Sequence, residues 1–229
     1  MSLFAIADLH LSLGSAKPMD IFSGWDNYVP RLEENWHKVI TEKDTVVIAG
    51  DVSWAMSLNE AKTDFAFLNS LPGQKLLLKG NHDYWWGTRK KMDAFLEENG
   101  FHTLHILHNC AYKVGSVSVC GTRGWFYDAE EDVDKKILNR EVGRLQASLS
   151  DAKSGTEPIV FLHYPPVYGG ERCEEILSVL QEHGIGRCYY GHLHGPSIRR
   201  AFTGNYGGTT MRLISGDAVG FLPVLVENQ

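Results

Sequence analysis

The sequence predicts an α/β protein with mixed β-sheets. Short apolar runs that end at polar residues alternate with stretches whose apolar residues recur at helical spacing, in both halves of the chain. Further short strand-like runs lie in the middle and at the end, which favours sheets that are not purely parallel. Because the 229 residues contain no internal repeat, low-complexity segment or linker, we expect a single domain over residues 1–229.

The chain opens with an apolar run over residues 3–7, which we interpret as the first strand. Glycine and proline residues are frequent between positions 11 and 30, so a long loop is expected there. Leu32, Trp36 and Ile40 then recur at a spacing of four. This spacing predicts an amphipathic helix over residues 29–41.

The β-branched run at residues 45–49 predicts the second strand. A helix is expected over residues 58–70, because Ser57 and Glu60 have the spacing of a capping box. Pro72-Gly73 marks its end.

Three consecutive leucines at residues 76–78 predict a third strand, and apolar spacing predicts a helix over residues 88–99. Two short runs, over residues 111–114 and 117–120, flank Gly115-Ser116 and predict a hairpin.

In the second half, an acidic loop is expected over residues 126–134 and a helix over residues 133–151. The runs at residues 159–162 and 187–190 predict strands, and apolar residues before Gly184 predict a helix between them. The tail is expected to form three short strands, over residues 197–202, 211–215 and 220–226.

The composition is that of an ordinary globular protein, with 43% hydrophobic and 22% charged residues. No apolar run is long enough to span a membrane, and the N-terminus lacks the basic region of a signal peptide, so we expect a cytoplasmic protein. The four cysteines form no C-x-x-C pair, which favours free buried thiols. The net charge of −6 argues weakly against broad binding to nucleic acid.

Five strand-like segments end in residues whose side chains bind metals. The blocks are Asp8-Leu9-His10, Gly50-Asp51, Gly80-Asn81-His82-Asp83, His163 and Gly191-His192-Leu193-His194. Side chains at strand ends sit on a rigid scaffold, and sites gather at the carboxyl ends of strands in α/β folds. The donors are carboxylates, an amide and imidazoles without a thiolate. This set suits Mn, Fe, Zn or Co better than a structural zinc site.

The number of these residues favours a pair of ions. The seven candidate ligands are Asp8, His10, Asp51, Asn81, His163, His192 and His194. Seven are too many for one open catalytic ion, but with one shared carboxylate they give four to each of two ions about 3.5–4 Å apart. Each block alone is more often structural, since a lone histidine is usually an ordinary core or surface residue. The conjunction of all five in one chain favours a metal site.

In this order, the blocks resemble the full motif set of the calcineurin-like metallophosphoesterase superfamily, and the resemblance spans residues 8–194. It implies a four-layer αββα sandwich of two mixed β-sheets flanked by helices, in agreement with the mixed sheets expected above. It also implies two divalent metal ions, with Asp51 bridging them. By this resemblance one ion is held by Asp8, His10, Asp51 and His194, and the other by Asp51, Asn81, His163 and His192.

The resemblance further implies a phosphoesterase in which a hydroxide that bridges the ions attacks phosphorus. His82 would lie beside the metals as a proton donor or oxyanion stabiliser, with Asp83 orienting its ring. Metal coordination lowers the pKa of water from 15.7 toward about 7, and a general acid contributes roughly 10²–10⁴-fold. Two divalent ions, the carboxylates of Asp8 and Asp51 and one hydroxide leave a net charge of about +1, which favours a phosphate anion.

The sequence after Asp51 departs from one branch of the superfamily. Protein Ser/Thr phosphatases continue with Asp-Arg-Gly, whereas Val52-Ser53-Trp54 stands here. We therefore expect a small-molecule phosphomonoester or phosphodiester as the substrate class, of which a nucleotide or cyclic nucleotide is one example. A nuclease and a non-catalytic metal-binding scaffold are the alternatives. Six further residues have two possible roles. The aromatic ones could line a substrate pocket and the arginines could bind a distal phosphate, or all could be ordinary core and surface residues. They are Tyr84, Trp85, Trp86, Arg89, Arg123 and Arg172.

Overall fold

The computed structural model describes residues 1–125 and 131–228 and contains two large mixed sheets. The five-stranded sheet has the order β13-β1-β2-β3-β4, in which the strands β1 to β4 pair in parallel and β13 is antiparallel to β1. Its strands are β1 (Ser2–Ile6), β2 (Thr45–Ala49), β3 (Gln74–Leu78), β4 (Leu104–Ile106) and β13 (Val224–Asn228).

The six-stranded sheet has the order β11-β12-β10-β7-β6-β5, and its four central strands are parallel while both outer strands are antiparallel to their neighbours. Its strands are β5 (Tyr112–Val114), β6 (Val117–Thr122), β7 (Glu157–Leu162), β10 (Arg187–Tyr190), β11 (Gly204–Tyr206) and β12 (Thr209–Leu213). A two-stranded ribbon, β8 (Val167–Tyr168) with β9 (Glu171–Arg172), lies apart from both sheets.

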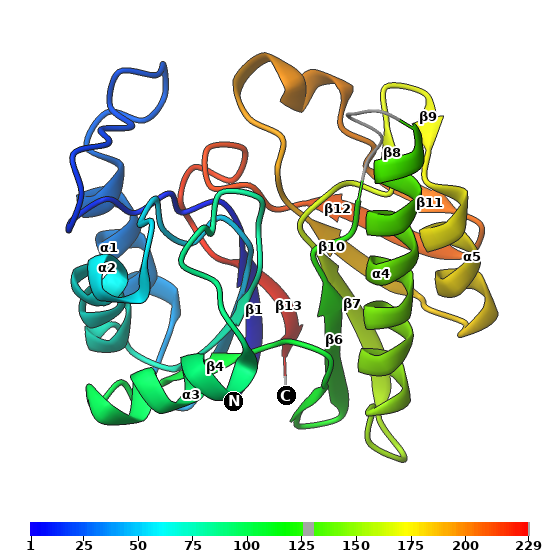
Figure 1. The fold of residues 1–229 in the computed structure, drawn as a ribbon, viewed down its shortest axis with the longest axis horizontal. Helices are drawn as coiled ribbons and strands as arrows, with labels where there is room; N and C mark the ends of the chain where they lie inside the picture. The colour runs from blue at the N-terminus through cyan, green and yellow to red at the C-terminus, as the bar shows by residue number, and fades with distance from the viewer. Residues whose placement is uncertain (126–130, 229) are drawn as a thin grey trace.

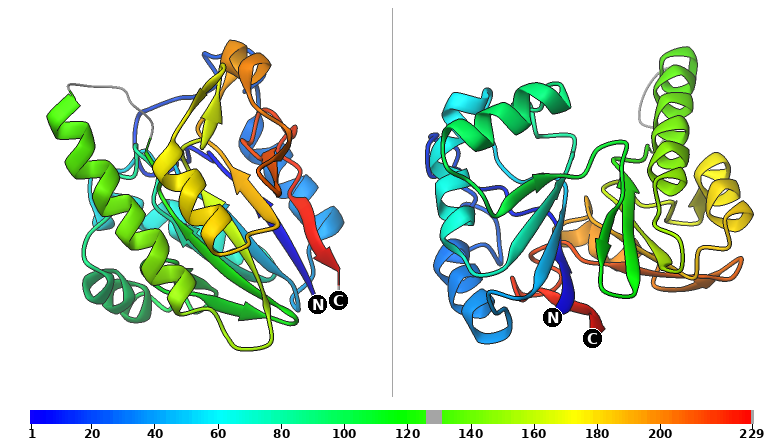
Figure 2. Two further views of the ribbon diagram at one scale, coloured as in Figure 1. Left: turned by 90° about the vertical axis from the view of Figure 1, so that its right-hand side faces the viewer. Right: turned by 90° about the horizontal axis from the view of Figure 1, so that it is seen from below.

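The helices cover the outer faces of the two sheets, which makes four layers (Figures 1 and 2). The helices α1 (Tyr28–Val39), α2 (Leu58–Ser70) and α3 (Arg89–Glu98) lie beside the five-stranded sheet, and α4 (Glu131–Ser150) and α5 (Glu174–Glu182) beside the six-stranded one. The predicted αββα sandwich of two mixed sheets is confirmed.

Alternation along the strands explains why residues 46–49 of β2 are all apolar. Val46 and Ile48 pack in the cluster under the helices, whereas Val47 and Ala49 pack between the two sheets. Successive strand side chains point to opposite faces, so a strand covered on both sides carries an unbroken apolar run. Phe161 of β7 belongs to the same middle layer as Val47.

The predicted helices and the hairpin are confirmed to within a few residues. At the start of α2, Ser57 Oγ accepts a hydrogen bond from the Glu60 N–H, as in a capping box. The Glu60 carboxylate accepts from the Met56 N–H at 2.9 Å, one residue before the position that the capping box requires. Gly115-Ser116 joins β5 to β6, as the hairpin prediction required.

Several predicted segments differ from the structure. The strand predicted over residues 197–202 is wrong, because Gly195–Arg200 forms a 3₁₀ helix, η1. Pro196 favours a helical turn at its start, and the Ser197 N–H donates to the His194 carbonyl at 3.0 Å. The acidic loop also ends earlier than predicted, since α4 begins at Glu131, and its remainder, 126–130, lies outside the described residues.

The ends of the tail strands shift by a few residues, and β8, β9 and β11 were not predicted. The strand predicted over 220–226 begins only at Val224, because the Phe221 N–H donates to the Gly216 carbonyl at 2.7 Å and closes a turn. All four cysteines are free, as expected. In the part of the chain that the structure describes, none of the helices has both the length and the apolar composition needed to cross a membrane.

Candidate metal centre

The carboxyl ends of the two sheets are tied together by backbone hydrogen bonds. Beyond β1, the Asp8 N–H donates to the Gly50 carbonyl and the His10 N–H to the Asp51 carbonyl, both at 2.9 Å. Ala7 also forms a bridge with Ser215, beyond the end of β12 in the other sheet. The first two ligand blocks therefore lie next to each other and next to the second sheet.

Four of the predicted ligands have left-handed backbone conformations. The φ angles are 59° at Asp8, 44° at His10, 49° at Asp51 and 74° at His192. Seven non-glycine residues in the described chain have a positive φ, so most of them lie at this site. Such residues cost of order 1–3 kcal/mol each and cluster at functional sites.

Glycines allow the blocks to approach one another. A Cβ at Gly191 would lie 2.5 Å from Asp8 Oδ2, and a Cβ at Gly80 would overlap the Asp51 side chain. Only glycine fits at these two positions, which explains why it precedes the ligand residues in both blocks.

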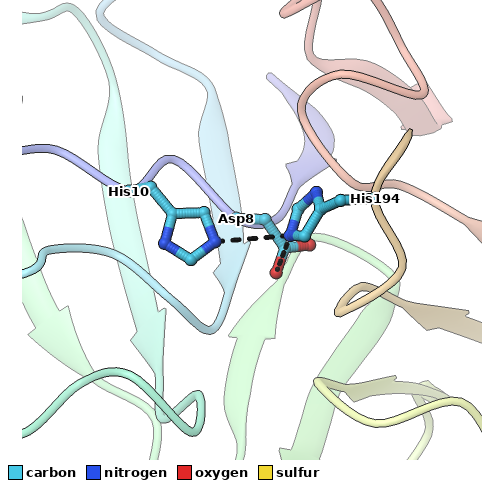
Figure 3. A group of neighbouring side chains, drawn as sticks. All are labelled: Asp8, His10 and His194. Carbon is cyan, nitrogen blue, oxygen red and sulfur yellow. Dashed lines mark hydrogen bonds and ion pairs between the residues drawn. The ribbon is translucent and has the colours of Figure 1, made fainter. Parts of the chain in front are cut away.

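The first cluster consists of Asp8, His10 and His194, whose side chains point toward one another (Figure 3). His194 Nε2 lies 3.3 Å from His10 Nε2 and 3.4 Å from Asp8 Oδ1. On the far side of the ring, His194 Nδ1 lies 3.0 Å from Asp217 Oδ1. With the proton on Nδ1, this hydrogen bond turns the free Nε2 toward the cluster.

The second cluster consists of Asp8, Asp51 and His163. Asp51 Oδ2 lies 3.6 Å from His163 Nε2 and also 3.6 Å from His10 Nε2 of the first cluster. Asn81 Oδ1 lies 2.6 Å from His163 Nε2 and 3.0 Å from His192 Nδ1. The structure therefore brings all seven predicted ligands to one place.

The donor atoms fit a divalent cation. Asp8 Oδ1 is buried and accepts no hydrogen bond within the described chain. His163 Nδ1 lies 3.2 Å from the Ala49 carbonyl, so a proton there leaves Nε2 free to bind a metal. Each cluster places one donor atom from each of its three residues within 4.8 Å of the others. Imidazole nitrogens with carboxylate oxygens suit Zn, Fe or Mn.

Burial also favours a bound cation. It lowers the pKa of His163 to about 3, so the imidazole is in the neutral form that binds metals. Burial, with the nearby carboxylates of Asp83 and Asp8, raises the pKa of Asp51 well above its usual value. Buried carboxylates that repel one another are stabilised by a cation between them.

His82 lies beside the first cluster. Its ring centroid is 5.7 Å from that of His10 and 4.4 Å from that of Trp54, and its backbone N–H donates to Asp51 Oδ1 at 2.8 Å. Burial and the neighbouring His192 lower its pKa. His82 is therefore within reach of a group bound at the metal centre.

Asp83 has a different position from the one expected of it. Its carboxylate accepts hydrogen bonds from the N–H groups of Gly80, Val52 and Ser53 at 2.7, 2.9 and 3.2 Å, and from Trp85 Nε1 at 3.0 Å. Within the described residues, none of these bonds comes from the His82 imidazole. Asp83 therefore fixes the loop between β3 and α3 against the loop that carries Asp51.

Comparison with known proteins identifies the family. Residues 1–196 match the sequence model described as calcineurin-like phosphoesterase. The chain belongs to the calcineurin-like phosphoesterase family. This match supports a metal-dependent phosphoesterase, and the two clusters supply residues for the divalent metals that the family binds.

The other similarities are more distant. An uncharacterized protein of Methanocaldococcus jannaschii, MJ1445, is 32% identical over 88 residues, which are 38% of this chain and 46% of that protein. The phosphopantetheinyl hydrolase of Mycobacterium tuberculosis has a TM-score of 0.58 at 14% identity, covering 98% of this chain and 95% of that one. A protein of unknown function from Aquifex aeolicus, AQ665, has a TM-score of 0.52 at 15% identity, with the same coverage. The two solved structures share the fold.

Several residues that flank the phosphoesterase motifs have structural contacts. Trp85 is buried, and its ring packs against Phe65 at 4.9 Å. Tyr84 is 53% exposed, and Trp86 packs at the edge of the core beneath the helices. Arg89 donates to Asp93 at 3.0 Å and to the Tyr112 hydroxyl at 2.9 Å, so it joins α3 to the hairpin.

The other two arginines also have partners. Arg123 donates to Glu141 at 3.3 Å and lies 4.9 Å from the Trp125 ring centroid. Arg172 lies over the ring of Tyr206 at 5.1 Å.

Sequence reasoning missed two residues of the site. Asp217, which contacts His194, follows the end of β12 in a Gly-Asp pair like the pair Gly50-Asp51 that follows β2. The same strand-end pattern could have revealed it. Trp54 stacks on His10 with 4.8 Å between ring centroids and an interplanar angle of 25°. No sequence pattern singled out Trp54, because its contact depends on how two loops pack.

Proposed function

We propose that this phosphoesterase hydrolyses a small-molecule phosphomonoester or phosphodiester at a site that holds two divalent ions. The observation that carries the proposal is the position of the Asp51 carboxylate between the two ligand clusters. Asp51 Oδ2 lies at the same 3.6 Å from His10 Nε2 of one cluster and from His163 Nε2 of the other. Two-ion hydrolases hold their ions about 3.5–4 Å apart, which is close enough for one carboxylate to contact both.

In this proposal, Asp8, His10, Asp51 and His194 hold one ion, and Asp51, Asn81, His163 and His192 hold the other. Bound ions of this kind act as Lewis acids on phosphoryl oxygens and lower the pKa of the attacking water. Asp217 keeps Nε2 of His194 turned toward the first ion by accepting the proton of Nδ1, which is supported by their 3.0 Å contact.

His82 serves as the proton donor to the leaving oxygen or as a stabiliser of negative charge on it. The position of its ring beside His10 supports this role, and the hydrogen bond from its backbone N–H to Asp51 holds the residue at the site. Asp83 acts indirectly, because it fixes the loop from which His82 projects. A positioned acid of this kind contributes roughly 10²–10⁴-fold to the rate.

A small-molecule substrate is favoured over a nucleic acid by the net charge of −6. The fold-level likeness to a protein named phosphopantetheinyl hydrolase is compatible with a small phosphoester. Nuclease activity and a non-catalytic scaffold are the competing functions that the experiment below must separate.

The test combines metal content with turnover. The full chain is loaded with Mn²⁺, its metal is counted by elemental analysis, and hydrolysis of bis-aryl phosphodiester, aryl phosphomonoester and single-stranded DNA is measured. Two ions per chain with turnover of an aryl ester are expected. Faster hydrolysis of the diester would indicate a diesterase, and faster hydrolysis of the monoester would indicate a phosphatase. Asp51→Asn is the matched control for contaminating activity. Metal binding without turnover of any substrate would favour the scaffold, and preference for DNA would favour the nuclease.

A further inference from the structure

A pocket of about 370 Å³ opens beside the candidate metal centre. His10, His82 and His194 of the centre line one part of it, so the pocket is continuous with the place proposed for the phosphoryl group. The rest of its lining comes from the loop between β1 and α1, from Trp54 and from the start of η1. In Figure 1 this loop is dark blue and η1 is orange.

The loop presents three apolar side chains to this pocket at a spacing of three residues. The Phe22 N–H donates to the Met19 carbonyl at 3.0 Å, and the Trp25 N–H donates to the Phe22 carbonyl at 3.1 Å. Successive turns of this kind bring residues i, i+3 and i+6 to the same side of the chain. Met19, Phe22 and Trp25 accordingly all line the pocket.

Trp25 forms a fixed wall. It is 2% exposed, and its ring makes edge-on contacts with Tyr28 at 5.2 Å and Phe221 at 5.0 Å. The Tyr28 hydroxyl donates to the His10 carbonyl at 2.8 Å, which ties this aromatic group to the metal centre.

Trp54 forms a second aromatic wall. Its ring lies 4.8 Å from His10 and 4.4 Å from His82, measured between centroids. Its Nε1 is buried and has no hydrogen-bond partner within the described chain. Because Trp54 packs on both histidines, the wall holds its position without a ligand.

The remaining lining favours an apolar ligand. Phe22 is 53% exposed although it borders a pocket with buried aromatic walls, so a ligand there would cover apolar surface that now faces water. Besides the three histidines and the indoles, Ser23 is the polar side chain in the described lining. The hydroxyls of a sugar would lose hydrogen bonds to water in such a pocket without replacing them.

We propose that this pocket binds a flat aromatic group esterified to the phosphate, so that the natural substrate is an aromatic phosphoester. The inference rests on the proposed function, because it assigns the part of the substrate next to the phosphoryl group. Aromatic rings gain from stacking and edge-on contacts with indole and imidazole rings beyond the area that they bury.

The test measures binding of phosphonates, which the enzyme does not hydrolyse, to the Mn²⁺-loaded full chain by calorimetry. Phenylphosphonate is expected to bind about tenfold more tightly than methylphosphonate, with cyclohexylphosphonate between them. 2,3-Dihydroxypropylphosphonate, the glycerol compound with a stable C–P bond, is expected to bind no more tightly than methylphosphonate. The inference is refuted if phenylphosphonate has no advantage over methylphosphonate, or if the cyclohexyl or glycerol compound binds more tightly than the phenyl one.

Variants in the exposed part of the loop test whether the loop causes the tighter binding of phenylphosphonate. Phe22→Ala is expected to reduce the advantage of phenylphosphonate about threefold and to leave the affinity for methylphosphonate unchanged. Ile21→Ala is the matched control, because Ile21 is 74% exposed and does not line the pocket. An equal effect of the two variants, or none from Phe22→Ala, would place the aromatic ring elsewhere and contradict the inference.

The outcomes separate this inference from the proposed function. If the loaded protein binds methylphosphonate and hydrolyses a generic ester, but shows no preference for the phenyl group, only the aromatic pocket is refuted. If it binds no phosphonate and hydrolyses no ester, the proposed function fails and the pocket inference fails with it.

Discussion

Replacing Asp217 by asparagine tests how the metal centre is oriented. One Asp217 oxygen lies 3.0 Å from His194 Nδ1, and the other accepts the Gly195 N–H at 2.9 Å. An asparagine amide has one oxygen and one NH₂ group, so in either orientation its NH₂ group faces a donor. With NH₂ toward the imidazole, the proton of His194 moves to Nε2, where it points at Asp8 and blocks metal binding.

The expected loss of metal affinity follows from the burial of the contact between Asp217 and His194. The Asp217 side chain is 7% exposed and that of His194 is 27% exposed. Burial alone lowers the pKa of His194, but the carboxylates of Asp8 and Asp217 outweigh it and raise the pKa to about 10, so a metal displaces the proton on Nε2 when it binds. A hydrogen bond to a charged group contributes about 1.5–3 kcal/mol. Since 1.4 kcal/mol corresponds to a factor of ten, we expect metal affinity to fall about 10- to 100-fold.

The assay is calorimetric titration of the metal-free protein with Mn²⁺ or Zn²⁺, with thermal unfolding as a check on folding. Asp26→Asn is the matched control, because it makes the same change of charge at an exposed position outside the two clusters. A folded Asp217→Asn protein with wild-type affinity would refute the orienting role. An equal loss in Asp26→Asn would show that only the net charge matters.

Three further changes test other parts of the structure. We expect His82→Ala to keep both metals but to lose roughly 10²–10⁴-fold in kcat, and full activity would contradict its role. Asp51→Asn should lose metal and activity together, since Asp51 contacts both clusters, and two ions bound at wild-type affinity would count against bridging. Burial lowers the pKa of Lys75 to about 8. The unfolded chain then binds more protons between pH 8 and 10, so Lys75 makes the free energy of unfolding rise with pH by roughly 1 kcal/mol per unit there. Chemical denaturation should show this rise in wild type relative to Lys75→Met, and parallel pH profiles would exclude it.

The sequence predicts best the elements that local rules determine. The β-branched strand β2 and the capped start of α2 follow directly from residues 45–49 and Ser57. The strand predicted over 197–202 failed because periodicity could not reveal the turn that Pro196 and Ser197 form after His194. The conformation there depends on the site, since the Gly195 N–H is held by Asp217.

The ligands of the site were predictable because each follows a strand, often after a glycine. The pocket was not predictable, since its walls depend on contacts between segments far apart in the sequence. Trp25 is positioned by Phe221, and Trp54 by its contact with His10. The Tyr84-Trp85-Trp86 run was a plausible aromatic wall, but Trp85 is core and Tyr84 is exposed.

The candidate metal centre draws its residues from both sheets. Asp8 and Asp51 come from strands of one sheet, whereas His163 and His194 follow strands of the other. Without cations, burial and the carboxylates of Asp83 and Asp8 raise the pKa of Asp51, and the backbone is left-handed at Asp8 and Asp51. Both features disfavour the folded state. Ions bound there, as we propose, would offset the repulsion at Asp51 and would bind the folded chain alone, because only folding brings these ligands together. We therefore expect metal binding to be coupled to the packing of the two sheets.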